Sequence, residues 1–99
     1  MGRDIFSLEG KTALITGAGG LLGPKHAEAI IEFGGKVIIT DHHVDRALEK
    51  ANNLNFKYGP DSATWHHMDV TNPKSIQEVL DCYEKIDILI NNAAIPSFL

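Results

Sequence analysis

The 99-residue sequence predicts an α/β fold in which a parallel sheet lies between layers of helices. Apolar runs alternate along the chain with stretches of helical spacing, in the order strand, helix, strand, helix, strand, helix, strand. Each intervening stretch is long enough for a right-handed crossover between parallel strands. The last run holds three consecutive apolar residues, Ile88 to Ile90, which is typical of a strand covered on both faces.

Four apolar runs bounded by turn-forming residues are interpreted as strands. Gly10 precedes the first run and Gly34-Gly35 precedes the second. The runs cover residues 11–16, 36–40, 63–68 and 87–91. The connection rules favour the strand order 3-2-1-4, which is half of a doubly wound sheet.

The three stretches between these runs are expected to be helices. The first has Pro24 in its first turn, where the missing N–H costs nothing. The second covers residues 44–58 and stops at Gly59-Pro60. The third begins at Asn72-Pro73, a side-chain cap followed by proline. The residues expected to face inward are Leu22, Ala27, Ile30, Ile31 and Phe33 in the first helix, and Ile76, Val79, Leu80 and Tyr83 in the third.

Composition and charge limit the classes of partner. With 43% hydrophobic residues, residues 1–99 suit one small domain. The net charge of -4 argues against a nucleic acid or an anionic membrane as the main partner. No apolar stretch approaches the roughly 20 residues that span a bilayer, and no secretory signal is visible, so a cytoplasmic protein is expected. The single cysteine, Cys82, cannot form an internal disulfide and is expected to be buried or half-buried.

The stretch "ITGAGGLLG" follows the first strand and opens the first helix. Gly17 would take the tight turn, Gly20 would let backbone N–H groups approach a phosphate, and Gly23 would let the helix pack close to the strand. The pattern, which includes Leu21 and Leu22, therefore predicts a dinucleotide pyrophosphate at the helix N-terminus. A P-loop would need Gly-Lys-Ser or Gly-Lys-Thr, which is absent here, and the remaining alternative is a flexible turn.

Two acidic residues follow the second and third strands, at the expected carboxyl edge of the sheet. Asp41 stands where the acid that receives the adenosine ribose hydroxyls is expected, so NAD is favoured over NADP. The neighbouring His42 would soften repulsion of a 2′-phosphate if it were protonated. Asp69 is positioned to accept from the adenine amino group, and the backbone of Val70 offers a donor. The alternative for each aspartate is a helix cap.

Two histidine pairs, His42-His43 and His66-His67, end neighbouring strands and are expected to approach one another. Because adjacent strand residues point to opposite faces, only one member of each pair could reach a shared metal ion. Further ligands are not evident, so solvated histidines and no metal site are expected.

Together these residues resemble the short-chain dehydrogenase/reductase family over nearly the whole chain. The run Asn91-Asn92-Ala93-Ala94 resembles the family's Asn-Asn-Ala-Gly signature, which implies that Asn91, Ala93 and Ala94 line the coenzyme site. The resemblance implies a Rossmann-like NAD(P)-binding domain and hydride transfer between NAD(H) and a hydroxyl or carbonyl group. The glycine spacing is closer to the family's extended branch, whereas the Asn-Asn-Ala run, to which we give more weight, is closer to the compact branch.

The family's catalytic residues have no counterpart in this chain. The resemblance implies a Tyr-x-x-x-Lys motif and a serine, but Tyr58 and Tyr83 have no lysine four residues later, and Ser97 comes too early in the fold. We therefore expect the coenzyme-binding half of a larger oxidoreductase, without catalytic residues and with an exposed fourth strand able to pair with another copy. The alternatives are part of an extended-branch sugar-nucleotide epimerase or dehydratase, and a non-catalytic dinucleotide-sensing module.

Overall fold

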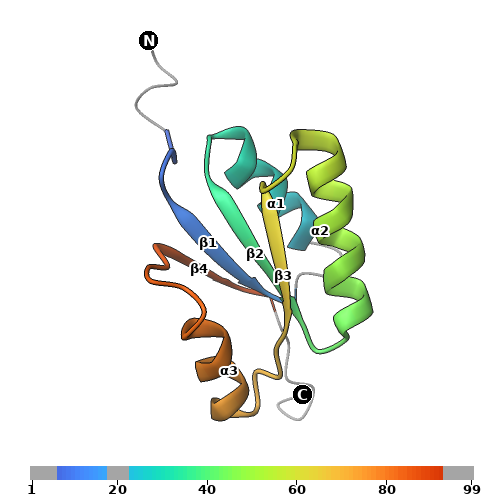
Figure 1. The fold of residues 1–99 in the computed structure, drawn as a ribbon, viewed down its shortest axis with the longest axis vertical. Helices are drawn as coiled ribbons and strands as arrows, with labels where there is room; N and C mark the ends of the chain where they lie inside the picture. The colour runs from blue at the N-terminus through green and yellow to red at the C-terminus, as the bar shows by residue number, and fades with distance from the viewer. Residues whose placement is uncertain (1–6, 18–22, 93–99) are drawn as a thin grey trace.

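The computed structural model describes residues 7–17 and 23–92, and its elements follow the predicted order. They are β1 Thr12–Thr16, α1 Gly23–Glu32, β2 Lys36–Asp41, α2 Val44–Tyr58, β3 Ala63–His67, α3 Pro73–Leu80 and β4 Ile88–Asn91. The strands form one parallel sheet in the order β3-β2-β1-β4, which confirms the prediction (Figure 1). Among the described residues, no helix is long and apolar enough to cross a membrane.

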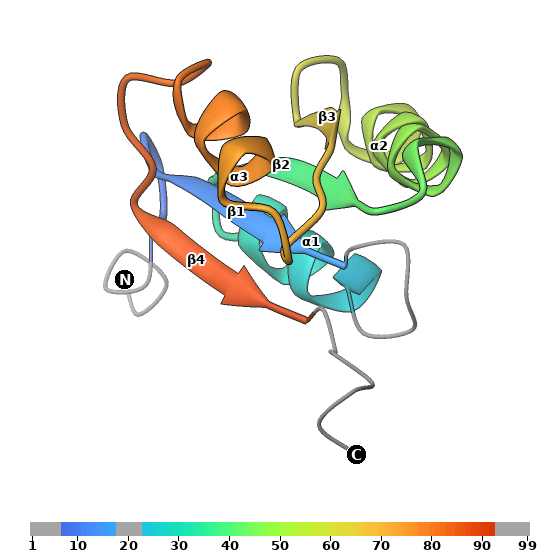
Figure 2. The same cartoon turned by 90° about the horizontal axis from the view of Figure 1, so that it is seen from below.

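The sheet lies between two helical layers. α1 and α2 pack on one face and α3 packs on the other (Figure 2). Successive strand residues point to opposite faces, so each strand supplies both layers. The α1/α2 face buries Ala13, Ile15, Ala27, Ile30, Val37, Ile39, Ala47, Ala51, Leu54 and Ala63. The α3 face buries Leu14, Ile38, Met68 and Val79.

Local chemistry accounts for the helix boundaries. Asn72 Oδ1 accepts a hydrogen bond of 3.0 Å from the Lys74 N–H, and Pro73 follows at the first helical position, as the sequence predicts. The turn between α1 and β2 needs glycine twice. Gly34 has a φ of 98°, and a Cβ on Gly35 would lie 2.8 Å from Ile30 Cγ2. These glycines let the chain reverse close against the end of α1.

Four sequence-based expectations about burial are wrong. Phe33, beyond the end of α1, is 47% exposed, and Leu80, at the end of α3, is 38% exposed. Cys82 is exposed because α3 ends two residues earlier, so the helical face extrapolated to it does not continue. β4 is not covered on both faces, since Leu89 on the α3 side is 68% exposed. Tyr83 is half-buried as expected, although it lies outside the helix.

Candidate functional site

The carboxyl ends of the parallel strands bring the predicted site residues to one edge of the sheet. β1 ends at Thr16, β2 at Asp41, β3 at His67 and β4 at Asn91. The strand order reverses between β1 and β4, because the chain moves outward from β1 to β3 and then returns to the other side of β1. In open α/β sheets ligands bind at this edge, beside the point of reversal.

The glycine turn joins β1 to α1 beside this point. Gly17 has a φ of 62°, a left-handed conformation that glycine adopts without steric cost. Gly23 is buried as the first residue of α1, so the helix starts close to the sheet. The N-terminus of a helix carries a positive partial charge, which favours anions in general. Gly20, Leu21 and Leu22 lie outside the described residues.

Asp41 is the last residue of β2 and is only 6% exposed. Its Oδ1 accepts a 2.8 Å hydrogen bond from the backbone N–H of His43, and the His43 Nδ1 lies 3.6 Å from the same oxygen. The Met68 N–H donates to the Asp41 carbonyl oxygen at 3.0 Å, which ties the ends of β2 and β3 together. Asp41 is not the cap of α2, since the N-cap is His43 and makes no side-chain cap bond. The structure thus fixes a carboxylate at the edge of the sheet.

Asp69 follows β3 and is held by its own loop. Its Oδ1 accepts from the Thr71 hydroxyl at 2.6 Å and from the Thr71 N–H at 2.9 Å. These bonds, followed by the positive potential of His42 and His67, lower the pKa of Asp69. The alternative that Asp69 caps α3 is wrong, because Asn72 takes that position. Val70, the next residue, is half-buried and lines a cavity described below.

The ends of β1, β4 and α1 are linked by side chains around the point of reversal. The Thr16 hydroxyl donates to Asn91 Oδ1 at 2.7 Å, and the Asn92 N–H donates to the Thr16 carbonyl at 3.2 Å. Asn92 Nδ2 lies 3.2 Å from His26 Nδ1, which joins β4 to the first turns of α1. Sequence analysis missed His26, because no local pattern pairs residues 66 positions apart. Ala93 and Ala94 lie outside the described residues.

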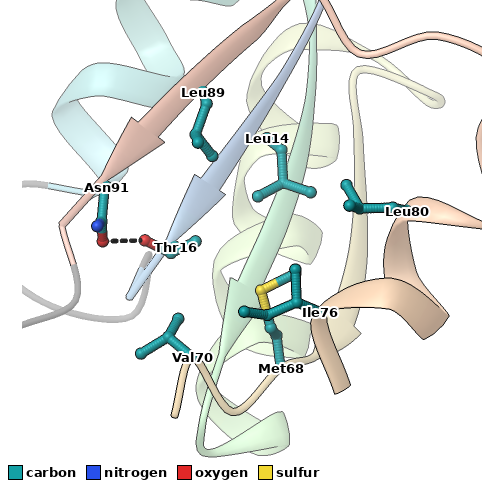
Figure 3. A pocket seen from close by; sticks show the side chains of 8 residues that line it. All are labelled: Leu14, Thr16, Met68, Val70, Ile76, Leu80, Leu89 and Asn91. Atoms are coloured by element: carbon teal, nitrogen blue, oxygen red, sulfur yellow. Dashed lines mark hydrogen bonds between the residues drawn. The ribbon is translucent and has the colours of Figure 1, made fainter. Parts of the chain in front are cut away.

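An apolar cavity of about 230 Å³ lies between α3 and the ends of β1 and β4 (Figure 3). Its walls are mainly aliphatic, with the hydrogen-bonded pair Thr16 and Asn91 on one side. It is lined by Leu14, Thr16, Met68, Val70, Ile76, Leu80, Leu89 and Asn91. The cavity thus gives the edge of the sheet an apolar floor on the α3 face.

The histidines divide between the two faces as the alternation rule predicts. The rings of His42 and His67 lie 5.9 Å apart, centroid to centroid, and that of His42 lies 5.3 Å from that of His43. His66 points to the other face, where its Nε2 lies 2.7 Å from the Tyr83 hydroxyl. Within residues 7–17 and 23–92, no group of three or more histidine, cysteine or acidic side chains is arranged to hold a metal ion.

The surroundings of both tyrosines raise the pKa of their hydroxyl groups. The Tyr58 hydroxyl donates to Glu32 at 2.7 Å, and this bond raises the pKa of Tyr58. Burial raises the pKa of Tyr83, whose hydroxyl contacts His66 and Thr64. A tyrosine that transfers protons near neutral pH needs a lowered pKa, whereas both hydroxyls here form hydrogen bonds that link different parts of the fold.

An open parallel sheet with a glycine turn, a helix N-terminus and a buried carboxylate at its carboxyl edge defines a nucleotide-binding α/β protein. A family model described as short chain dehydrogenase matches residues 11–98. The chain belongs to this family, whose members bind NAD(P) coenzymes. The match favours a dehydrogenase or reductase over the extended-branch epimerase or dehydratase that the glycine spacing left open.

Three known proteins illustrate the relationship. Sorbitol dehydrogenase of Cereibacter sphaeroides is 41% identical over 92 residues, covering 89% of this chain and 34% of that protein. A short-chain type dehydrogenase/reductase from Mycobacterium marinum is 36% identical with a TM-score of 0.83, covering 93% of this chain and 38% of that one. A 3-ketoacyl-(acyl-carrier-protein) reductase from Brucella melitensis, complexed with NADH, is 35% identical with a TM-score of 0.75, covering 90% and 36%. The chain spans about a third of the length of most curated relatives it matches.

Proposed function

We propose that this chain is the coenzyme-binding portion of an NAD-dependent oxidoreductase that transfers hydride between NAD(H) and a hydroxyl or carbonyl substrate. Asp41 is the observation that carries the choice of NAD. Its buried carboxylate, fixed by the His43 N–H, stands at the carboxyl end of the strand next to the glycine turn. A carboxylate there accepts hydrogen bonds from ribose hydroxyls and repels a 2′-phosphate.

The described residues fit the coenzyme at both ends of this site. Gly17 and Gly23 place no side chain at the end of β1 or at the first position of α1, which supports a diphosphate at the helix N-terminus. A like-charge contact between Asp41 and a 2′-phosphate costs up to about 4 kcal/mol per charge pair at 4 Å and an effective dielectric of 20. The complete proposed set of coenzyme contacts is Gly17, Gly20, Leu21, Leu22, Gly23, Asp41, His42, Asp69, Val70, Asn91, Ala93 and Ala94.

The bound coenzyme supplies the hydride chemistry, and this chain's residues bind and orient it. We propose that the 99 residues turn over no substrate themselves, because neither Tyr58 nor Tyr83 is followed by a lysine at the fourth position and the pKa of each is raised. We assign the protein to the cytoplasm, a reducing compartment that suits its lone exposed thiol.

Calorimetric titration of the chain with NADH and NADPH tests the role of Asp41. We expect NADH to bind more tightly, and Asp41→Asn to narrow the NADH-to-NADPH affinity ratio by about tenfold or more, since it removes the charge that repels the 2′-phosphate. Asp61→Asn is the matched control, because Asp61 is exposed in the turn before β3, at the opposite edge of the sheet. Equal affinity of the unmodified chain for both coenzymes would remove the preference for NAD, and no binding of either at millimolar concentration would end the proposal.

A further inference from the structure

Three imidazoles gather where β2 and β3 end. His42 and His43 follow β2 directly, and His67 is the last residue of β3, paired in register with Asp41. The ring of His42 contacts both of the others, with its centroid 5.3 Å from that of His43 and 5.9 Å from that of His67. All three residues are exposed, so a ligand at the edge of the sheet has access to them.

The group His42, His43 and His67 is exposed and lies outside the two buried clusters of the core. The fourth histidine of the two pairs, His66, is partly buried on the α3 face and bonded to Tyr83. The His43 backbone N–H donates to Asp41 Oδ1, and the His43 Nδ1 lies 3.6 Å from the same oxygen. The three rings stand beside the carboxylate that we propose to receive the ribose, which is the place where a 2′-phosphate would extend.

The elements that meet at this edge carry charges of both signs. Two carboxylates lie beside the rings, since Asp41 Oδ1 is 3.6 Å from His43 Nδ1 and Asp69 interacts electrostatically with His42 and His67. Asp41 from β2, Asp69 after β3 and Asp45 in the first turn of α2 are acidic, whereas Arg46 in that turn and Lys25 in the first turn of α1 are basic. Residues 18–22 in the sequence contain no titratable side chain. Three carboxylates therefore outnumber two cations while the histidines are neutral, and three added protons reverse the sign.

We infer that His42, His43 and His67 form a proton-gated subsite for the phosphomonoester on the ribose of NADP. This inference rests on the proposed function. Histidine is the side chain whose charge changes between about pH 5 and 8. At alkaline pH the neutral rings leave Asp41 to exclude the 2′-phosphate, so NAD is preferred. At mildly acidic pH the imidazolium groups attract the phosphate and offset Asp41, so the chain accepts both coenzymes.

The 2′-phosphate of the ligand also gains a proton in this pH range, and its effect must be separated from that of the histidine rings. A phosphomonoester has its own pKa near about 6, so part of its charge, and of its repulsion by Asp41, is lost over the same range. This effect is a property of the ligand and persists without the histidines. The contribution of the rings is therefore the difference in pH dependence between the unmodified chain and a variant that lacks them.

The first experiment measures the dissociation constants of NADH and NADPH by calorimetry at pH 6.0 and 8.5. Each exposed charge contact changes an affinity roughly two- to fivefold. With three such contacts, we expect the dissociation constant of NADPH, divided by that of NADH, to fall about tenfold or more between pH 8.5 and 6.0. In His42→Gln/His43→Gln/His67→Gln, we expect most of this fall to disappear. His66→Gln, which changes the histidine on the other face, is the matched control and should keep it.

A second experiment needs no variant and covers the case in which the triple change prevents folding. The ring protons of the three histidines are titrated by NMR with NADH or NADPH bound. If protonated rings favour the phosphate, they must titrate at higher pH with NADPH than with NADH, since binding and protonation are linked.

Equal titration with the two coenzymes, or a triple variant with the pH dependence of the unmodified chain, would overturn the inference while leaving the proposed function in place. Absence of binding by either coenzyme at both pH values would overturn both.

Discussion

The two faces of the sheet differ in how completely they are covered. On the α1/α2 face, β1 and β2 residues such as Ile15 and Ile39 are fully buried beneath two helices. On the α3 face, the single helix of residues 73–80 buries the centre of the sheet, but Leu89 is 68% exposed and a cavity of about 230 Å³ stays open. Strand residues that are equally apolar thus have different roles. Where helices cover them they stabilise the core, and where no helix covers them they form part of the surface.

The proposed binding residues come from both faces of the sheet. Val70 and Asn91 line the cavity on the α3 face, whereas Asp41 continues the alternate positions of β2 that face α1 and α2. The linked pair Thr16 and Asn91 lies at the α3 side of the point where the strand order reverses. The closed face supplies a rigid support, in which β2 is fixed between β1 and β3. The paired strands thus position side chains of both faces at the same edge of the sheet.

The strongest test of the difference between the two faces is a matched pair of side-chain truncations. Ile39→Ala and Leu89→Ala each remove three carbon atoms, one from the closed face and one from the open face. We expect Ile39→Ala to lower the free energy of unfolding by about 2 to 5 kcal/mol through the cavity it leaves. Leu89→Ala should change it by less than about 0.5 kcal/mol, as is usual for exposed positions. Urea unfolding followed by circular dichroism measures both, and equal losses would show that the faces are equivalently packed.

A smaller effect on stability is expected from His66, which lies on the α3 face. Burial lowers the pKa of His66 below its ordinary value of 6.5, so the unfolded chain binds this proton more readily than the folded chain. Stability should therefore fall as the pH drops below about that value, and His66→Gln should flatten this part of the profile. Thermal unfolding between pH 7.5 and 5 measures it.

The carboxylates with a lowered pKa contribute little to the change in stability between pH 7.5 and 5. Glu28, Asp69 and Asp87 have a lowered pKa, so the stability they contribute is lost as the pH falls below their ordinary values, which are 4.5 for Glu28 and 3.8 for the two aspartates. Thr71 bonds are the main cause for Asp69, and the Thr12 N–H bond is the main cause for Asp87. An unchanged slope in His66→Gln between pH 7.5 and 5 would show that burial of this ring does not affect folding.

The smallest expected effect on stability concerns the edge of the open face. β4 is an edge strand of the described sheet, and an unpaired edge is a template for pairing with another copy. We propose that the chain self-associates there. Leu89→Lys should shift sedimentation velocity profiles towards the monomer while leaving the free energy of unfolding nearly unchanged. Glu78→Lys, an exposed change on α3, is the control, and a chain that is monomeric at all concentrations contradicts the proposal.

Local signals were sufficient to predict most of the fold. The bounds of α2 follow from a stop signal at Gly59-Pro60, and the start of α3 follows from Asn72-Pro73. The strand order is that of half of a doubly wound sheet, which is one of the few arrangements of four parallel strands that the connection rules allow. The carboxyl-edge positions of Asp41 and Asp69 follow from the strands that precede them. Their contacts with a coenzyme stay predictions.

What the sequence could not predict depends on contacts between distant parts of the chain. The exposure of Leu80 depends on how much of the α3 face is covered, and a helical pattern carries no information about that. The contact of His26 with Asn92 joins two elements that neither local spacing nor composition connects. The bonds between Asp69 and Thr71 are local, yet several acceptors within a loop compete for the same donors.

The bond between Thr16 and Asn91 has a consequence for molecular recognition. An asparagine amide has one oxygen and one NH₂ group, and the threonine hydroxyl engages the oxygen at 2.7 Å. The NH₂ group is thereby oriented away from Thr16, so β4 ends in a pair of hydrogen-bond donors with a fixed direction. Thr16→Val would remove that constraint and let the amide rotate, which would convert a selective donor into a group that pairs equally with donors and acceptors.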